Sequence, residues 1–109
     1  MDNIQFLVLR SLIHNEEYIR KVIPFIKADY FEEYTQKVVF EETLKFVEEY
    51  NKPITKEALC IEIEKRTDIN DTTFKECTDL IFSLTDEPVE FNWLVNTTEK
   101  WCRDRAIYL

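Results

Sequence analysis

The sequence predicts an all-α fold, a compact bundle of about six helices, and three observations support this class. The 109 residues contain no glycine and only three prolines, so long stretches lack the residues that most often interrupt helices. Apolar residues recur at intervals of three and four. Hydrophobic residues make up 45% of the chain, which is enough to form a buried core, and the length is typical of one domain.

The N-terminal half is predicted to hold three helices. Ile4, Leu7, Val8 and Leu12 recur at helical spacing and indicate the first one. The second helix follows Asn15, a good N-cap, and Pro24 is expected to end or kink it. The third is predicted over residues 32–50 as the central helix, and its inner face is expected to contain Phe40, Thr43, Leu44, Val47 and Tyr50.

The C-terminal half is predicted to hold three more helices. Thr55 is expected to cap a fourth helix with Ala58, Leu59 and Ile63 on its inner face. Asn70 or Asp71 is expected to cap the fifth, whose apolar positions are Phe74, Cys77, Leu80, Ile81 and Leu84. The sixth opens near Glu90, and no common helix terminator precedes residue 109, so the chain is expected to stop within this helix.

The sixth helix carries the candidate interface residues. Its predicted apolar face consists of Phe91, Leu94, Val95, Trp101, Cys102, Tyr108 and Leu109. Trp93 and Ile107 fall instead on the polar side with Lys100, and large apolar groups there are typical of a protein contact. The alternative is that isolated surface apolar residues are ordinary. We select Trp93, Lys100, Ile107 and Tyr108 as candidate contact residues.

Arg105 lies in the middle of the apolar stripe of the same helix. A buried arginine needs a partner, because an unpaired charge is costly away from water. A pair with an acid, or hydrogen bonds to helix-end carbonyls, within the same domain is favoured over a contact between subunits. Arg105 is therefore expected to be a structural support for the sixth helix.

Composition excludes several classes of site. Phosphate-cradling loops, dinucleotide-binding turns and nucleophile elbows all need glycine, so no cofactor site is expected. The net charge of −8 disfavours strong direct binding to nucleic acid, and the favoured interpretation of the acidic surface is that it keeps the domain soluble. Three cysteines without a CxxC motif and a single histidine predict neither disulfides nor a metal site. No secretion signal or membrane span is evident, which favours the cytoplasm.

No catalytic residue is expected. The carboxylate pairs Glu32/Glu33, Glu41/Glu42, Glu48/Glu49 and Glu62/Glu64 are interpreted as solvated helix surface. His14 ends the first helix, where a contact with the helix dipole is favoured over catalysis. Cys77 and Cys102 fall on apolar faces and are expected to be small buried hydrophobic residues.

Two segments together resemble the N-terminal domain of DnaB-type replicative DNA helicases. Residues 8–59, VLRSLIHNEEYIRKVIPFIKADYFEEYTQKVVFEETLKFVEEYNKPITKEAL, are similar to the family's opening helices and its Pro-Ile-Thr turn. Residues 86–109, DEPVEFNWLVNTTEKWCRDRAIYL, resemble its entry into a helical hairpin, closest to the version of large tailed phages. The resemblance implies that the chain divides into a globular head over residues 1–90 and the start of a truncated hairpin or linker helix over residues 91–109.

The resemblance implies a role in the collar of a hexameric helicase. Such domains organise the ring by self-association and dock primase and the helicase loader, while ATP and magnesium belong to a separate motor domain. The implied setting is the cytoplasm of an infected bacterial host. The alternative is a free-standing small acidic helical protein that binds a host regulator, with imitation of the charge of nucleic acid as one way to do so. Binding that falls steeply with added salt would favour that alternative.

Overall fold

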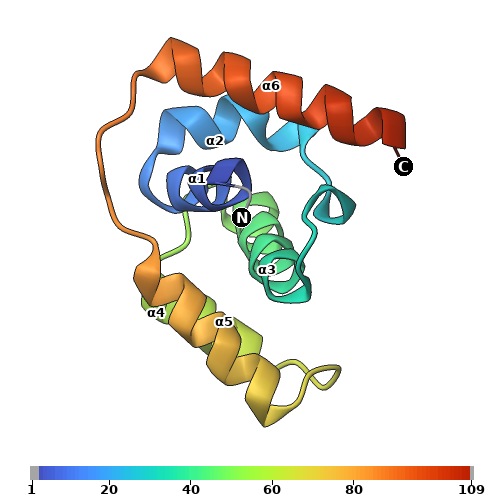
Figure 1. Ribbon diagram of the computed structural model, residues 1–109. Coiled ribbons are helices and arrows are strands. Elements are labelled where there is room, and N and C mark those ends of the chain that lie inside the picture. Colours follow the sequence, from blue (N-terminus) through green and yellow to red (C-terminus); the bar gives the residue numbers. More distant parts are fainter. Residues whose placement is uncertain (1–2, 109) are drawn as a thin grey trace.

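The computed structural model describes residues 3–108, and this part of the chain contains six α-helices, two short 3₁₀ helices and no strand (Figure 1). The expected all-α class is confirmed. Leu109, expected on the sixth helix, lies outside the described residues. The elements in chain order are α1 Asn3–His14, α2 Glu16–Val22, η1 Ile23–Phe25, η2 Ala28–Tyr30, α3 Tyr34–Tyr50, α4 Lys56–Glu64, α5 Asp71–Ser83 and α6 Phe91–Tyr108.

Side-chain caps start three of the helices where the sequence predicts them. Asn15 Oδ1 accepts the N–H of Tyr18 at the start of α2. Thr55 Oγ1 accepts the N–H of Ala58 at the start of α4. Asn70, rather than Asp71, caps α5. Each cap satisfies a backbone N–H that has no partner within the helix, so these short polar residues fix the helix starts.

Helix α3 begins two residues later than predicted. Glu33 is its N-cap and forms a capping box with Gln36, which sets the first helical residue at Tyr34. The preceding N–H of Glu32 donates to Gln5 Oε1 at 2.8 Å, so this backbone group is satisfied outside the helix. The helix ends at Tyr50 and is followed by its C-cap, Asn51, whose φ of 55° is left-handed. Asparagine tolerates this conformation better than most residues, so it takes the place that glycine commonly has.

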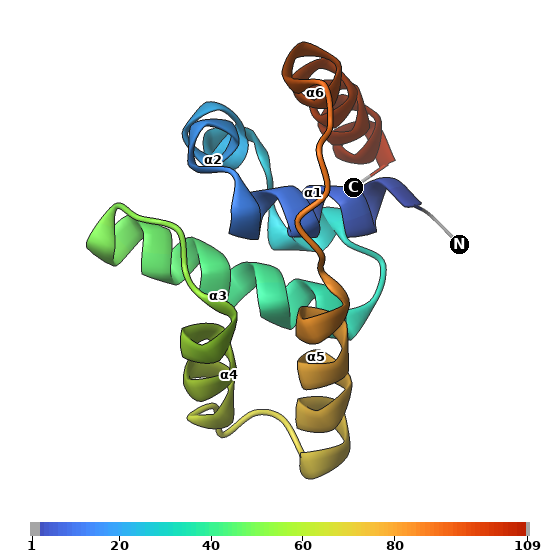
Figure 2. The same cartoon turned by 90° about the vertical axis from the view of Figure 1, so that its left-hand side faces the viewer.

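Helix α3 is central to the arrangement, as expected. It packs against α1, α4, α5 and η2. Helix α6 lies along α2 and α1, on the side of the molecule opposite to α4 and α5 (Figures 1 and 2). Helices α4 and α5 form an antiparallel hairpin beneath α3 (Figure 2). The core between these layers is one cluster, and its largest fully buried side chains include Tyr18, Phe31, Phe40, Leu9, Leu12, Ile54, Leu59, Ile63, Ile81, Leu84 and Leu94.

Two aromatic residues expected on inner faces are exposed instead. Tyr50 is 58% exposed because it is the last residue of α3, where its ring packs on Phe46 with centroids 4.6 Å apart. Tyr108 is 81% exposed at the last turn of α6, beyond the part of that helix whose residues are buried. Helical spacing predicts the direction of a side chain but not whether a neighbouring element extends far enough to cover it.

Candidate protein-interaction surface on α6

Helix α6 is anchored through one buried face. The side chains of Leu94, Val95, Thr98, Trp101 and Cys102 are buried against the rest of the domain, which confirms the inner face apart from its ends. The hydroxyls of Tyr18 and Thr98 are hydrogen-bonded at 2.7 Å in the core between α2 and α6. The Trp101 ring meets the rings of Tyr30 and Phe31 edge-on. These contacts fix the rotation of α6, and therefore fix which residues face outward.

Arg105 binds within the domain. Its Nε donates a hydrogen bond of 2.8 Å to the carbonyl oxygen of Tyr30, the last residue of η2. Its Nη1 lies 3.9 Å from Glu32 Oε1. The side chain is 26% exposed, so the guanidinium lies at the edge of the core and not inside it. A charge-assisted bond to the end of a helical turn ties the last part of α6 to the η2 segment.

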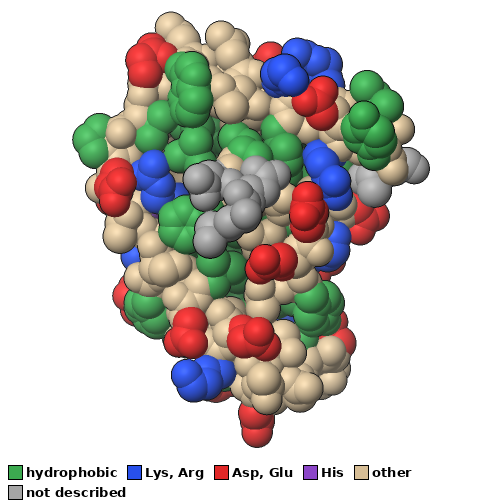
Figure 3. Space-filling model, in the orientation of Figure 1, with side chains coloured by type: hydrophobic (Ala, Val, Ile, Leu, Met, Phe, Trp, Pro, Cys, Tyr) green, Lys and Arg blue, Asp and Glu red, His purple; other side chains and the backbone are tan. Residues whose placement is uncertain are grey.

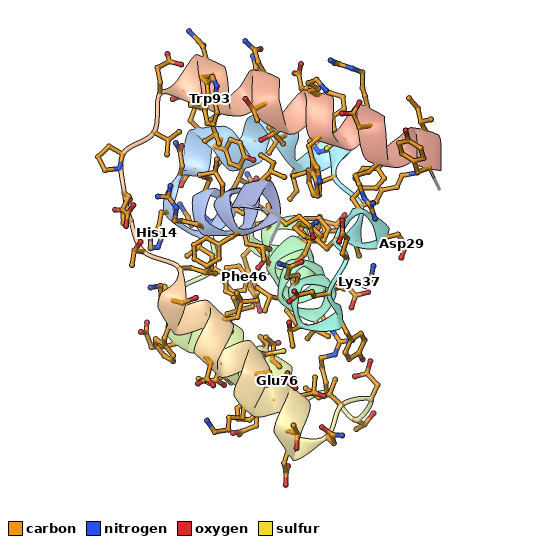
Figure 4. All side chains as sticks on the ribbon, in the orientation of Figure 1. His14, Asp29, Lys37, Phe46, Glu76 and Trp93 are labelled. Atoms are coloured by element: carbon orange, nitrogen blue, oxygen red, sulfur yellow. The ribbon has the colours of Figure 1, made fainter. Side chains whose placement is uncertain are left out.

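The outward face of α6 carries the four candidate contact residues. Trp93 is 53% exposed and Ile107 is 76% exposed, at opposite ends of the helix. Between them, Lys100 Nζ lies 2.9 Å from Asp104 Oδ2, and both side chains are largely exposed. Figure 3 shows hydrophobic side chains near both ends of α6 and charged ones between them, and Figure 4 labels Trp93 near the start of the helix. Tyr108 completes this face at the C-terminal end.

A groove runs along each side of α6. One has a volume of about 410 Å³ and lies between α6 and the first turn of α1; its lining is Ile4, Thr97, Lys100, Trp101, Asp104, Arg105 and Tyr108. The other, of about 390 Å³, lies toward η1 and η2, and its lining is Phe25, Tyr30, Glu99, Cys102, Arg103 and Ala106. Among the described residues, Trp101 Nε1 is buried without a hydrogen-bond partner. Open, partly apolar grooves beside a helix suit side chains of a partner better than a small molecule.

The structure shows a contact of His14 that the sequence could not specify. His14 Nε2 lies 2.9 Å from the carbonyl oxygen of Leu84, and the guanidinium of Arg10 donates to the carbonyl oxygen of Glu87 at 2.8 Å. Both contacts hold the extended linker between α5 and α6 against α1. His14 is therefore part of a packing contact far along the chain, and Figure 4 shows it beside this linker.

Glu42 corrects the expectation that every carboxylate pair is solvated surface. Its side chain is 6% exposed and its Oε2 lies 3.0 Å from Arg66 Nη1. Arg66 also contacts Glu41 at 3.2 Å and Asp68 at 2.7 Å. The hydrogen bond from Arg66 lowers the pKa of the Asp68 carboxyl. Sequence reasoning missed this cluster, because the contacts join α3 to the end of α4 across more than twenty positions.

The two buried thiols are held in their neutral form. Burial raises the pKa of both Cys77 and Cys102 to about 11, so neither is an activated nucleophile at neutral pH. Across residues 3–108, no group of three or more His, Cys, Asp or Glu side chains is placed to hold a metal ion. In the same range, no helix combines the length and apolarity that crossing a membrane requires.

The fold and surface define an all-α domain that leaves one face of its last helix uncovered. Over 102 residues, 94% of the chain, the sequence is 31% identical to a DnaB-like replicative helicase of Enterobacteria phage T4. The chain is thus a relative of DnaB-like replicative helicases, and the resemblance stated above is confirmed. The matched chain spans only 21% of the length of that helicase. No protein-family profile matches the chain.

Proposed function

We propose that the chain is the N-terminal collar segment of a hexameric phage replicative helicase. In this role it organises the ring by self-association, docks primase and the helicase loader, and performs no catalysis itself. The observation that carries the proposal is the match to a DnaB-like replicative helicase over 94% of the chain. ATP and magnesium would be bound by a motor domain elsewhere in the parent protein, which would act in the cytoplasm of the bacterial host.

The outer face of α6 supports the proposal at the level of residues. Exposed Trp93 and Ile107 offer the kind of aromatic and aliphatic anchors that dominate binding energy at protein contacts. Lys100 and Tyr108 extend the same face, and Arg105 supports the helix through the Tyr30 carbonyl. The net charge of −8 opposes direct nucleic-acid binding, so partners are expected to be proteins.

Capture of the cognate primase and loader on the immobilised chain tests the docking role. The double variant Trp93→Ala with Ile107→Asp should reduce binding about tenfold or more, because it removes both anchors. A matched control exists on the α4–α5 hairpin, where Phe82 is 54% exposed and Ile61 is 57% exposed. The variant Phe82→Ala with Ile61→Asp should bind like wild type. Absence of capture by wild type at tens of micromolar would reject docking by this chain.

A further inference from the structure

Helices α4 and α5 present a second outward face, on the side of the molecule opposite to α6 (Figures 1 and 2). On α4, Glu57, Ile61 and Glu64 are exposed and occur at intervals of four and three residues, which places them on one stripe of the helix. Leu59 and Ile63 are fully buried on the other side of α4, where it packs against α3 and α5. The stripe therefore points away from the core.

Helix α5 extends this face across the hairpin. The side chain of Cys60 is hydrogen-bonded to the side chain of Thr78, which fixes the register of the two antiparallel helices (Figure 2). One turn beyond Thr78, α5 carries Phe82. Because the helices are antiparallel, Phe82 lies beside the turn of α4 that precedes Cys60 and contains Glu57. The α4–α5 face is defined here by six residues: Glu57, Cys60, Ile61, Glu64, Thr78 and Phe82.

Two large apolar side chains on this face are in contact with water. Ile61 is 57% exposed and Phe82 is 54% exposed, and the half-buried Cys60 lies where the two helices meet. Single exposed apolar side chains are ordinary on a protein surface, whereas several that share one face are typical of a protein contact. A partner that covers both side chains would remove them from water, which favours binding.

The charge of the face indicates the chemistry of the partner. Over residues 56–83, carboxylates outnumber cations by seven to four. Three of these cations already pair with nearby acids: Lys65 with Glu62, Arg66 with Asp68, and Lys75 with Asp79. Glu57 and Glu64 take part in none of the ion pairs between described residues, and they flank Ile61 on the stripe. Phosphates would be repelled by this face, and so would a second copy of it.

We propose that the α4–α5 face binds a basic amphipathic helix of another protein, which lies along α4. Glu57 and Glu64 are seven residues apart, about 10 Å along the axis, so they match two basic residues two turns apart on the partner helix. Apolar side chains between those basic residues would cover Ile61 and Phe82. This site is additional to the docking of primase and loader on α6. The two faces lie on opposite sides of the domain, so both can be occupied at once.

A synthetic helical peptide tests this site. The probe is an alanine-rich peptide of about 20 residues, with two lysines seven positions apart and leucines between them on the same stripe. Its affinity for the whole chain should fall about tenfold for Ile61→Ala with Phe82→Ala, which removes the apolar anchors. Glu57→Gln with Glu64→Gln should weaken binding to a similar extent and make it less dependent on salt. In NMR spectra, the probe should shift amides of α4 and α5 and leave those of α6 unchanged.

A charge-matched variant separates this site from general attraction to an acidic protein. Glu17→Gln with Asp29→Asn removes the same charge from exposed positions of α2 and η2, and this variant should bind the probe like wild type. A peptide with glutamates in place of the lysines should not bind. Circular dichroism should show native helix content for every variant.

Four outcomes would overturn the proposal. They are an absence of binding at high micromolar concentration, equal weakening by both pairs of charge variants, amide shifts spread over the whole domain, and self-association of the chain that Ile61→Ala with Phe82→Ala abolishes. The last would make a second copy the occupant of the face. Capture of primase through α6 should be unchanged by Glu57→Gln with Glu64→Gln, so failure of this site would leave the proposed function standing.

Discussion

Arg66 shows how one side chain can hold separate parts of this chain together. It lies just after α4 and contacts Glu41 and Glu42 on α3 as well as Asp68 in the following loop. Glu42 is almost fully buried, and in place of water its carboxylate has Arg66 Nη1 at 3.0 Å and the more distant Lys45 Nζ at 3.6 Å as partners. Removing a partner from a buried charge costs more than the pair itself contributes, because the remaining charge stays desolvated.

We therefore expect Arg66→Ala to lower the free energy of unfolding by roughly 2 kcal/mol. This lies below the value typical of fully buried pairs, because Arg66 is at the edge of the core. Urea denaturation followed by circular dichroism measures the change. Lys65→Ala is the matched control, since the Lys65–Glu62 pair is exposed and contributes little. Equal effects of the two substitutions would show that Arg66 is an ordinary surface charge.

At the scale of elements, α2 and α6 are joined by a buried polar contact within an apolar interface. Tyr18 is fully buried, and its hydroxyl bonds to Thr98 Oγ1 at 2.7 Å. Burial raises the pKa of Tyr18 well above its ordinary range, so the hydroxyl stays protonated and able to donate. Each hydroxyl depends on the other, because the surrounding core is apolar.

A double-mutant cycle tests that dependence. Tyr18→Phe should lower the free energy of unfolding by about 1–2 kcal/mol, because it leaves the Thr98 hydroxyl buried without a partner. Thr98→Val should have a similar cost for the reverse reason. The double variant should be less destabilised than the sum of the two, since replacing both partners leaves no orphaned group. Strict additivity in urea denaturation would mean that the hydroxyls do not stabilise each other.

The same scale shows what the sequence could predict and what it could not. Helix starts at Asn15, Thr55 and Asn70 were predictable, because a cap bonds a backbone N–H only three positions away. The exposure of Trp93 and Ile107 was predictable from helical spacing. The partners of His14 and Arg105 lie 70 and 75 positions away, so no local pattern encodes them. The burial of Glu42 could not be predicted from the sequence for the same reason.

At the scale of the whole molecule, the helices differ in how many other helices pack against them. Helix α1 packs against α2, α3 and α6, whereas the main contacts of α4 are with α3 and α5 alone. Figure 2 shows the α4–α5 hairpin extending away from the layer of α1, α2 and α6. The hairpin rejoins that layer through the linker that Arg10 and His14 hold against α1. A hairpin supported on one side can open while the remaining helices stay packed.

Native-state hydrogen exchange should therefore distinguish two units. Amides of α4 and α5 are expected to exchange through a lower-energy opening than amides of α1 and α3, because the hairpin is held mainly by one neighbouring helix, α3, whereas α1 packs against α2, α3 and α6. Arg66→Ala should accelerate exchange in α4 and α5 selectively, since Arg66 ties the end of α4 to Glu42 on α3. The control Lys65→Ala should leave both units unchanged. Uniform exchange across all four helices, or equal acceleration everywhere by Arg66→Ala, would show that the domain opens as a single cooperative unit in which the hairpin has no separate stability.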